Sequence, residues 1–242
     1  MKRIETIGPV LFALAVLPAF WLIRAHAAET GYNIEGQIAL LTSNGEKPAR
    51  DESKVAEWLV PEDASASSAD SPAKIYRMVQ QDKRFDPDML VVPVGSVVSF
   101  PNRDPWFHNV FSLYRGKRFD LGLYQAGDVR RVRFDRLGPS YIFCNIHPQM
   151  AAVILTVGSE YFGLSDKVGR VEISDVPAGR YRLNVWYENA DADALHALAR
   201  DVVVNDDRAL PEVSINVVPH DLRNHKNKYG QDYDTGALSP NY

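Results

Sequence analysis

The chain has 242 residues, 45% of them hydrophobic and 24% charged, which is typical of one large or two small globular domains. Its formal net charge is −4 at pH 7, and no basic stretch of the kind that binds nucleic acid stands out. Fifteen Gly and fifteen Pro are spread along the chain, which favours a β-rich architecture with many turns over a helical one.

Residues 1–27 have the pattern of a secretory signal peptide. Two basic residues precede an almost wholly apolar run over residues 7–23, and Ala25-His26-Ala27 offers small residues at both positions that signal peptidase reads. We therefore expect export to the periplasm and cleavage after Ala27. The alternative is an uncleaved membrane anchor, because the apolar run is long for a signal peptide. No later run is long enough to span a bilayer, so no stable membrane span is expected after cleavage.

The mature chain divides into segments that differ in their sequence pattern. Residues 32–60 alternate loosely and predict strands, and the linker 61–73 is rich in small polar residues. Residues 74–158 follow as a dense series of short β-rich segments without an amphipathic helix, which predicts an antiparallel sandwich or barrel. Residues 163–218 alternate again and predict four strands, with a helical turn or a loop over 190–199.

Four potential metal ligands lie in the middle segment. Cys144 is the only cysteine of the chain and follows an alternating strand; His147 and Met150 come directly after it, and His108 lies upstream. Two imidazoles, a thiolate and a weak axial thioether are the ligands of a type 1 (blue) copper site. Taken alone, a methionine or a cysteine is more often a core residue than a ligand. The joint pattern predicts one copper ion held by all four.

The residues beside these ligands are expected to support the site. Asn109 is predicted to hydrogen-bond to the ligand loop and to hold its geometry still. Pro105, Trp106, Phe107 and Pro148 are predicted to surround the copper as an apolar docking patch, because transient redox partners use small interfaces of this kind.

The segment 76–157 resembles the plastocyanin/amicyanin group of cupredoxins. The resemblance rests on the strand 92–102 (VPVGSVVSFPN), on residues 108–110 (HNV) and on the C-x-x-H-P-x-M loop, whose short spacing is most like amicyanin. It implies a Greek-key sandwich that cycles between Cu(I) and Cu(II), with electrons entering near His147. In layout the chain is similar to larger bacterial cupredoxin proteins of the methylamine-utilisation type, although nothing in the sequence recognises an amine.

The flanking segments predict a second sandwich. Residues 32–60 look like the opening of a carboxypeptidase-regulatory-like (transthyretin-like) sandwich, and the continuation expected of such a domain is found only at 166–186. The predicted fold class is therefore all-β, with a cupredoxin Greek-key sandwich inserted in, or flanked by, a second sandwich. The alternative is an N-terminal extension that packs on the cupredoxin domain.

The polar tail, residues 219–242, has no periodicity and is expected to lie on the surface or to be partly disordered. His220 and His225, near Asp221 and Asp232, resemble a second metal site, but a solvated tail explains them more simply. No catalytic triad, paired carboxylates or phosphate-binding loop stands out, so we expect no enzymatic activity.

The leading interpretation is a periplasmic electron-transfer protein with one type 1 copper ion and an unidentified protein redox partner. The alternative is a copper storage, delivery or interaction protein without a redox-carrier role. A catalytic copper site with an open position is disfavoured by Met150, because this residue completes the ligand set.

Overall fold

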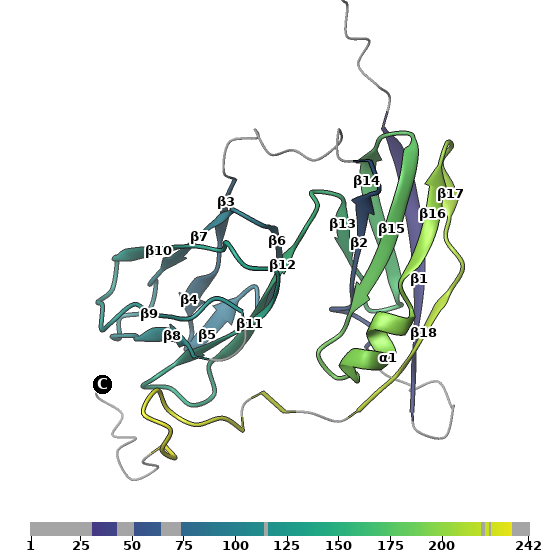
Figure 1. Cartoon of the computed structure of the whole chain (residues 1–242). Coiled ribbons are helices and arrows are strands. Elements are labelled where there is room, and N and C mark those ends of the chain that lie inside the picture. Colours follow the sequence, from purple (N-terminus) through teal and green to yellow (C-terminus); the bar gives the residue numbers. More distant parts are fainter. Residues whose placement is uncertain are drawn as a thin grey trace, which may run out of the picture.

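The computed structural model describes residues 31–42, 51–63, 74–113, 116–218, 221–222 and 224–233. Within them the chain is almost entirely β-strand, with one short helix, α1 (Ala192–Ala197) (Figure 1). In the same residues no helix has the length and apolar character needed to cross a membrane. The predicted signal peptide, most of the predicted linker and His220 lie outside the described residues.

The middle of the chain forms two sheets that share one core, which we call the first body. Its three-stranded sheet has the order β10 (Val129–Arg133), β7 (Val97–Pro101), β3 (Ile75–Arg77). Its five-stranded sheet has the order β6 (Met89–Pro93), β12 (Ala151–Val157), β11 (Gly138–Cys144), β8 (Val110–Ser112), β9 (Phe119–Asp120). Val98 and Phe100 of β7 and Ile142 of β11 are buried in the same apolar cluster. Alternate residues of facing strands thus fill one core, as in a β-sandwich.

A hairpin of β4 (Val79–Gln81) and β5 (Arg84–Asp86) adds to the first body. Its turn residues, Asp82 and Lys83, both have positive φ, at 55° and 53°. A two-residue turn of this type is usually made by Asn-Gly, because other residues are strained there. This turn is supported from elsewhere in the fold, by the carboxylate of Asp104.

The chain on either side of the first body forms a second pair of sheets, which we call the second body. One sheet contains β14 (Arg170–Val176), β1 (Tyr32–Leu41) and β17 (Arg208–Ala209), with β18 (Val213–Asn216) also paired to β1. The other has the order β13 (Phe162–Leu164), β2 (Ala56–Pro61), β15 (Gly179–Trp186), β16 (Arg200–Val204). Both strands that precede the first body therefore pair with strands that follow it, β1 with β14 and β2 with β15.

The two bodies lie side by side and meet through apolar side chains of β12 (Figure 1). Ala152 and Ile154 are buried in the core of the first body, whereas Val153 and Leu155 belong to a cluster that includes Trp58 of the second body. A strand that is buried on both faces needs apolar residues at nearly every position. The continuous run AAVILTV over β12 meets this need.

Glu57 of β2 is a buried carboxyl group in the second body. It is 0% exposed, and neither of its carboxylate oxygens has a hydrogen-bond partner among the described residues. Burial raises the pKa of Glu57 to about 7, and the charge of Arg200 opposes this rise. Gly36 of β1 leaves the room that the carboxyl group occupies, since a Cβ there would meet Glu57 Oε2. The second body thus contains a group whose protonation is linked to its stability.

Candidate metal centre

Three of the four predicted ligands converge at one end of the first body. His108 lies just before β8, Cys144 ends β11, and His147 follows in the next loop. His108 Nδ1 lies 3.5 Å from Cys144 Sγ and 3.2 Å from His147 Nδ1, and Cys144 Sγ lies 3.7 Å from His147 Nδ1. All three side chains are buried. Antiparallel pairing of β8 with β11, which sets Val110 opposite Cys144, keeps the two distant ligand segments side by side.

The three donor atoms fit a single metal ion. Donors that share one first-row transition metal at about 2.0–2.3 Å each lie roughly 3–4 Å from one another, and the three separations here are 3.2, 3.5 and 3.7 Å. A cation placed between the two imidazole nitrogens and the sulfur accepts a lone pair from each of them. A thiolate with two imidazoles is a donor set that suits copper or zinc.

Burial shifts the pKa values of Cys144 and His108. It raises the pKa of Cys144 and lowers the pKa of His108, because low-polarity surroundings penalise the charged form. The rise in the pKa of Cys144 is opposed by hydrogen bonds to its sulfur from the backbone N–H groups of Asn109, Ile146 and His147. The neutral imidazole is already the form that binds metal, while the thiolate is stabilised by these donors and by a bound cation.

Met150, the predicted axial ligand, is fully buried in the same apolar cluster as Cys144. Its backbone N–H donates to the His147 carbonyl at 3.0 Å, and its carbonyl accepts from the Cys144 N–H at 3.2 Å. These two hydrogen bonds hold the loop 144–150 against the end of β11. Met150 also lines a cavity of about 630 Å³ between the two bodies. Its role as a copper ligand stays a prediction.

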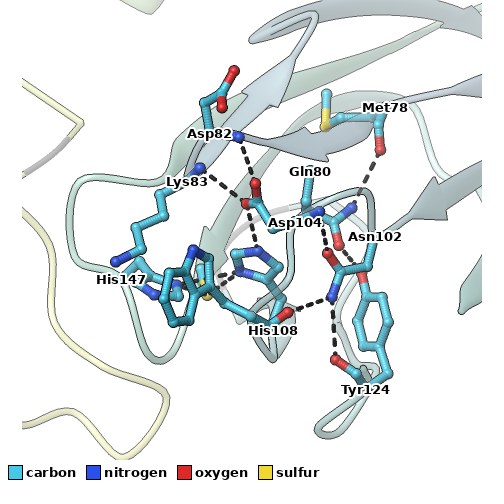
Figure 2. A network of polar contacts seen from close by, with 11 residues as sticks. Met78, Gln80, Asp82, Lys83, Asn102, Asp104, His108, Tyr124 and His147 are labelled. Carbon is cyan, nitrogen blue, oxygen red and sulfur yellow. Dashed lines mark hydrogen bonds and ion pairs between the residues drawn. The ribbon is translucent and has the colours of Figure 1, made fainter. Parts of the chain in front are cut away.

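Asp104 orients His108, a role that was not predicted from the sequence. Asp104 Oδ2 lies 2.9 Å from His108 Nε2, which leaves Nδ1 of the ring facing Cys144 (Figure 2). Although burial acts to raise it, the pKa of Asp104 lies below its ordinary value, because the backbone N–H of Lys83, the His108 ring and the backbone N–H of Asp82 donate to the carboxylate. An ionised carboxylate on the far nitrogen fixes the tautomer and the orientation of a metal-binding imidazole.

The same carboxylate stabilises the β4–β5 turn. The N–H groups of Asp82 and Lys83 donate to the two oxygens of Asp104 at 2.6 and 2.9 Å (Figure 2). Asn102 Oδ1 in turn accepts from the Asp104 N–H at 3.0 Å, and the Asn102 amide donates to the Trp106 carbonyl at 2.7 Å. The Asp82 and Lys83 N–H groups fix the carboxylate of Asp104, and Asn102 fixes its backbone. The carboxylate that contacts His108 is therefore already oriented.

Replacing Asp104 with asparagine is expected to weaken copper binding about 10- to 100-fold, the usual effect of removing a partner of a metal-binding histidine. The neutral amide no longer favours the tautomer that leaves Nδ1 free for the metal. A competition titration with a copper chelator measures this change. Asp135→Asn is the control, because Asp135 is an exposed carboxylate that pairs with Lys117. Equal affinities of the two variants would show that Asp104 does not orient His108.

Asn109 contacts the ligand loop through its backbone. Its carbonyl accepts from the Asn145 N–H at 2.9 Å, and its own N–H is directed at the Cys144 sulfur. The hydrogen bond between Asn109 and the ligand loop is thus made by the backbone, and the side chain donates to Asp120 Oδ1. The backbones of Asn109 and Asn145 are close because the two residues lie beside the paired ends of β8 and β11.

The predicted docking patch is partly exposed. Phe107 is 50% exposed and Pro105 is also exposed, whereas Trp106 and Pro148 are half-buried. His147, at 3% exposure, lies beneath the surface rather than on it. Residues that were not predicted also reach this end of the body, because the C-terminal tail packs on the ligand loop.

The group of His108, Cys144 and His147 is the only set of three or more potential His, Cys, Asp or Glu ligands that the described residues bring together. His225, which was weighed as part of a second metal site, has its ring nitrogens beside the carbonyls of Lys226 and Pro148 at 3.0 and 3.1 Å. Its described contacts are therefore to the polypeptide.

Several solved structures resemble part of the chain. A purple cupredoxin from Nitrosopumilus maritimus is 22% identical, with 34% of this chain and 99% of that chain covered and a TM-score of 0.31. Amicyanin from Paracoccus versutus is 18% identical, with 41% and 91% covered and a TM-score of 0.32. A copper-containing nitrite reductase from Thermus scotoductus SA-01 is 22% identical, with 40% of this chain but 25% of that chain covered and a TM-score of 0.33. No protein-family model and no curated protein sequence matches the chain.

Proposed function

We propose that this chain is an exported type 1 copper protein that carries single electrons between protein partners. The observation that supports the proposal most strongly is the buried convergence of His108 Nδ1, Cys144 Sγ and His147 Nδ1 within 3.7 Å. Copper, when bound, would supply a one-electron Cu(I)/Cu(II) couple, and Met150 is the proposed fourth residue that would hold it. The proposed role is that of a carrier and not of an enzyme.

The task of the protein residues is to keep the donors in one arrangement in both oxidation states. Asp104 holds the ring of His108, and the pairing of β8 with β11 holds Cys144 beside it. Backbone bonds between Met150 and its neighbours fix the loop that carries His147. A preorganised site adds little reorganisation to the barrier for electron transfer.

The proposed domain organisation is a cupredoxin domain, residues 74–158, inserted into a transthyretin-like sandwich. The pairing of β1 with β14 and of β2 with β15 supports it, because the strands of residues 32–60 then share sheets with those of residues 163–218. Insertion is tolerated where the ends of the inserted domain lie close together. Residues 1–27 are the proposed signal for export to the periplasm.

Electrochemistry tests the electron-transfer role. The copper-loaded protein is expected to give a reversible one-electron wave in cyclic voltammetry, and the zinc-loaded protein is the matched control without a wave, since zinc has no redox chemistry. A tightly bound copper ion without a reversible wave would favour storage or delivery and contradict the carrier role.

Replacing Met150 with leucine is expected to raise the reduction potential of the bound copper. The thioether is a weak donor, and its loss removes electron density that favours the more highly charged Cu(II) state. Met78→Leu is the control, because Met78 is equally buried in the same apolar cluster. Equal potentials of the two variants, measured by voltammetry, would exclude Met150 as the axial ligand.

A further inference from the structure

The described end of the C-terminal tail crosses from the second body to the ligand loop of the first (Figure 1). The chain leaves β18 after Asn216, and residues 224–233 lie against the end of β11 and the loop 144–150. We call residues 224–233 the C-terminal clamp. The clamp comes from outside the cupredoxin-like segment, yet it contacts the loop that carries most of the predicted ligands.

Three hydrogen bonds join the clamp to the loop, one to each of three loop residues. They run from the Tyr233 hydroxyl to the Cys144 carbonyl at 2.8 Å, from the Lys228 N–H to Asn145 Oδ1 at 2.9 Å, and from His225 Nε2 to the Pro148 carbonyl at 3.1 Å. Each clamp donor therefore fixes an acceptor in the loop.

Aromatic contacts place the clamp against the strand that delivers the thiolate. The His225 ring stacks on Phe143, with ring centroids 3.9 Å apart and planes 25° apart. The rings of Tyr233 and His225 are T-shaped relative to each other, with centroids 5.2 Å apart and an angle of 87° between their planes. Phe143 directly precedes Cys144 and is 2% exposed, so the stack packs on a residue that is itself fixed in the core.

An ion pair extends the contact to the other ligand segment. Lys228 Nζ lies 2.8 Å from Asp120 Oδ2, and the second oxygen of Asp120 accepts from the Asn109 side chain. Asn109 directly follows His108, and its backbone N–H is directed at the Cys144 sulfur. The clamp thus bridges the two parts of the chain that supply the predicted ligands.

We infer that His225 and Tyr233 are positioning residues of the metal centre, which hold the loop 144–150 in its metal-binding arrangement through the Cys144 and Pro148 carbonyls. Within the loop, the backbone bonds of Met150 and the N–H groups of Ile146 and His147 directed at the Cys144 sulfur hold its shape, and the clamp adds contacts from outside it. This inference rests on the proposed function, since positioning is useful only if the loop binds copper.

Full-length variants test the inference with readouts that do not depend on electron-transfer activity. Tyr233→Phe removes one hydroxyl and keeps the ring. His225→Ala removes both the stack and the bond to Pro148, whereas His225→Phe keeps the stack alone. His196→Ala is the control, because His196 is an exposed histidine on α1 of the second body.

The expected results concern the loop amides and the bound copper. Without metal, hydrogen exchange of the backbone amides of residues 145–147, 149 and 150 is expected to become about tenfold faster in Tyr233→Phe and in His225→Ala, because each change removes at least one hydrogen bond to the loop. Copper affinity is expected to fall about tenfold in both, with a shift of the visible spectrum. His225→Phe is expected to fall between these variants and the wild type, and His196→Ala is expected to match the wild type.

Two negative outcomes separate the inference from the proposed function. A wild-type protein without a type 1 copper spectrum would overturn the proposed function. A wild type with that spectrum, accompanied by Tyr233→Phe and His225→Ala variants that match His196→Ala in exchange, affinity and spectrum, would overturn the clamp alone.

Discussion

Replacing Cys144 with serine is expected to abolish the intense visible absorption of the copper-loaded protein. The absorption of a type 1 site comes from charge transfer between the thiolate and Cu(II), and a serine hydroxyl supplies neither the charge nor the soft donor. Copper affinity is expected to fall by more than the roughly 10- to 100-fold loss that follows removal of a supporting residue. Absorption spectroscopy and chelator competition measure the two effects.

Ser112→Ala is the matched control for this variant. Ser112 lies on β8, the strand beside Cys144, and is 0% exposed, and its hydroxyl has no hydrogen-bond partner among the residues that the structure describes. Its replacement alters a buried side chain near the site and leaves the predicted ligands unchanged. The visible band should survive in Ser112→Ala, and its survival in Cys144→Ser would rule out the thiolate as a ligand.

Replacing Glu57 is expected to remove most of the pH dependence of the stability of the second body. The pKa of Glu57 rises from 4.5 to about 7 on folding, so the folded protein keeps a proton that the unfolded chain releases. The contribution of Glu57 to the free energy of unfolding therefore falls as the pH rises from 4.5 to about 7, and it is constant above that range. The shift corresponds to roughly 3 kcal/mol, because each pKa unit is equivalent to about 1.4 kcal/mol.

Guanidinium unfolding at pH 5 and pH 8 measures this effect. Glu57→Leu is expected to be more stable than the wild type at pH 8 and to lose the difference between the two pH values, because leucine carries no buried charge. Glu35→Gln on β1 is the control, since Glu35 is exposed. If wild type and Glu57→Leu lost the same stability between pH 5 and pH 8, Glu57 would not be the titrating group.

Features that depend on local pattern could be predicted from the sequence. The apolar run of β12 and the alternation of β15 predicted those strands, and the C-x-x-H spacing placed Cys144 and His147 in one loop. Donors so close in sequence converge whenever the loop is tight. Of the two alternatives for residues 190–199, a helical turn or a loop, the structure has the helix α1, which begins after Asp191, whose side chain accepts from the Ala194 N–H.

Features that depend on tertiary contacts could not be predicted. Within the β-rich segment 74–158, the run IYRMVQ is divided at Met78 into two strands, because β3 pairs with β7 while β4 pairs with β5. The role of Asp104 was not predicted although His108 lies only four residues away, because a D-x-x-x-H spacing alone does not show that the two side chains meet. The other groups that hold the carboxylate are backbone N–H groups of a turn more than twenty residues away. The tail contacts were missed for the same reason: polar residues without periodicity carry no information about the surface on which they pack.

The visible and electron paramagnetic resonance spectra of the full-length protein loaded with one equivalent of Cu(II) test the central claim most directly. A type 1 site predicts an intense thiolate charge-transfer band in the visible range, together with the small copper hyperfine splitting that a strongly covalent thiolate bond produces. A colourless protein with an ordinary Cu(II) spectrum, or one that binds no copper, would contradict the assignment of His108, Cys144 and His147 to a blue-copper centre.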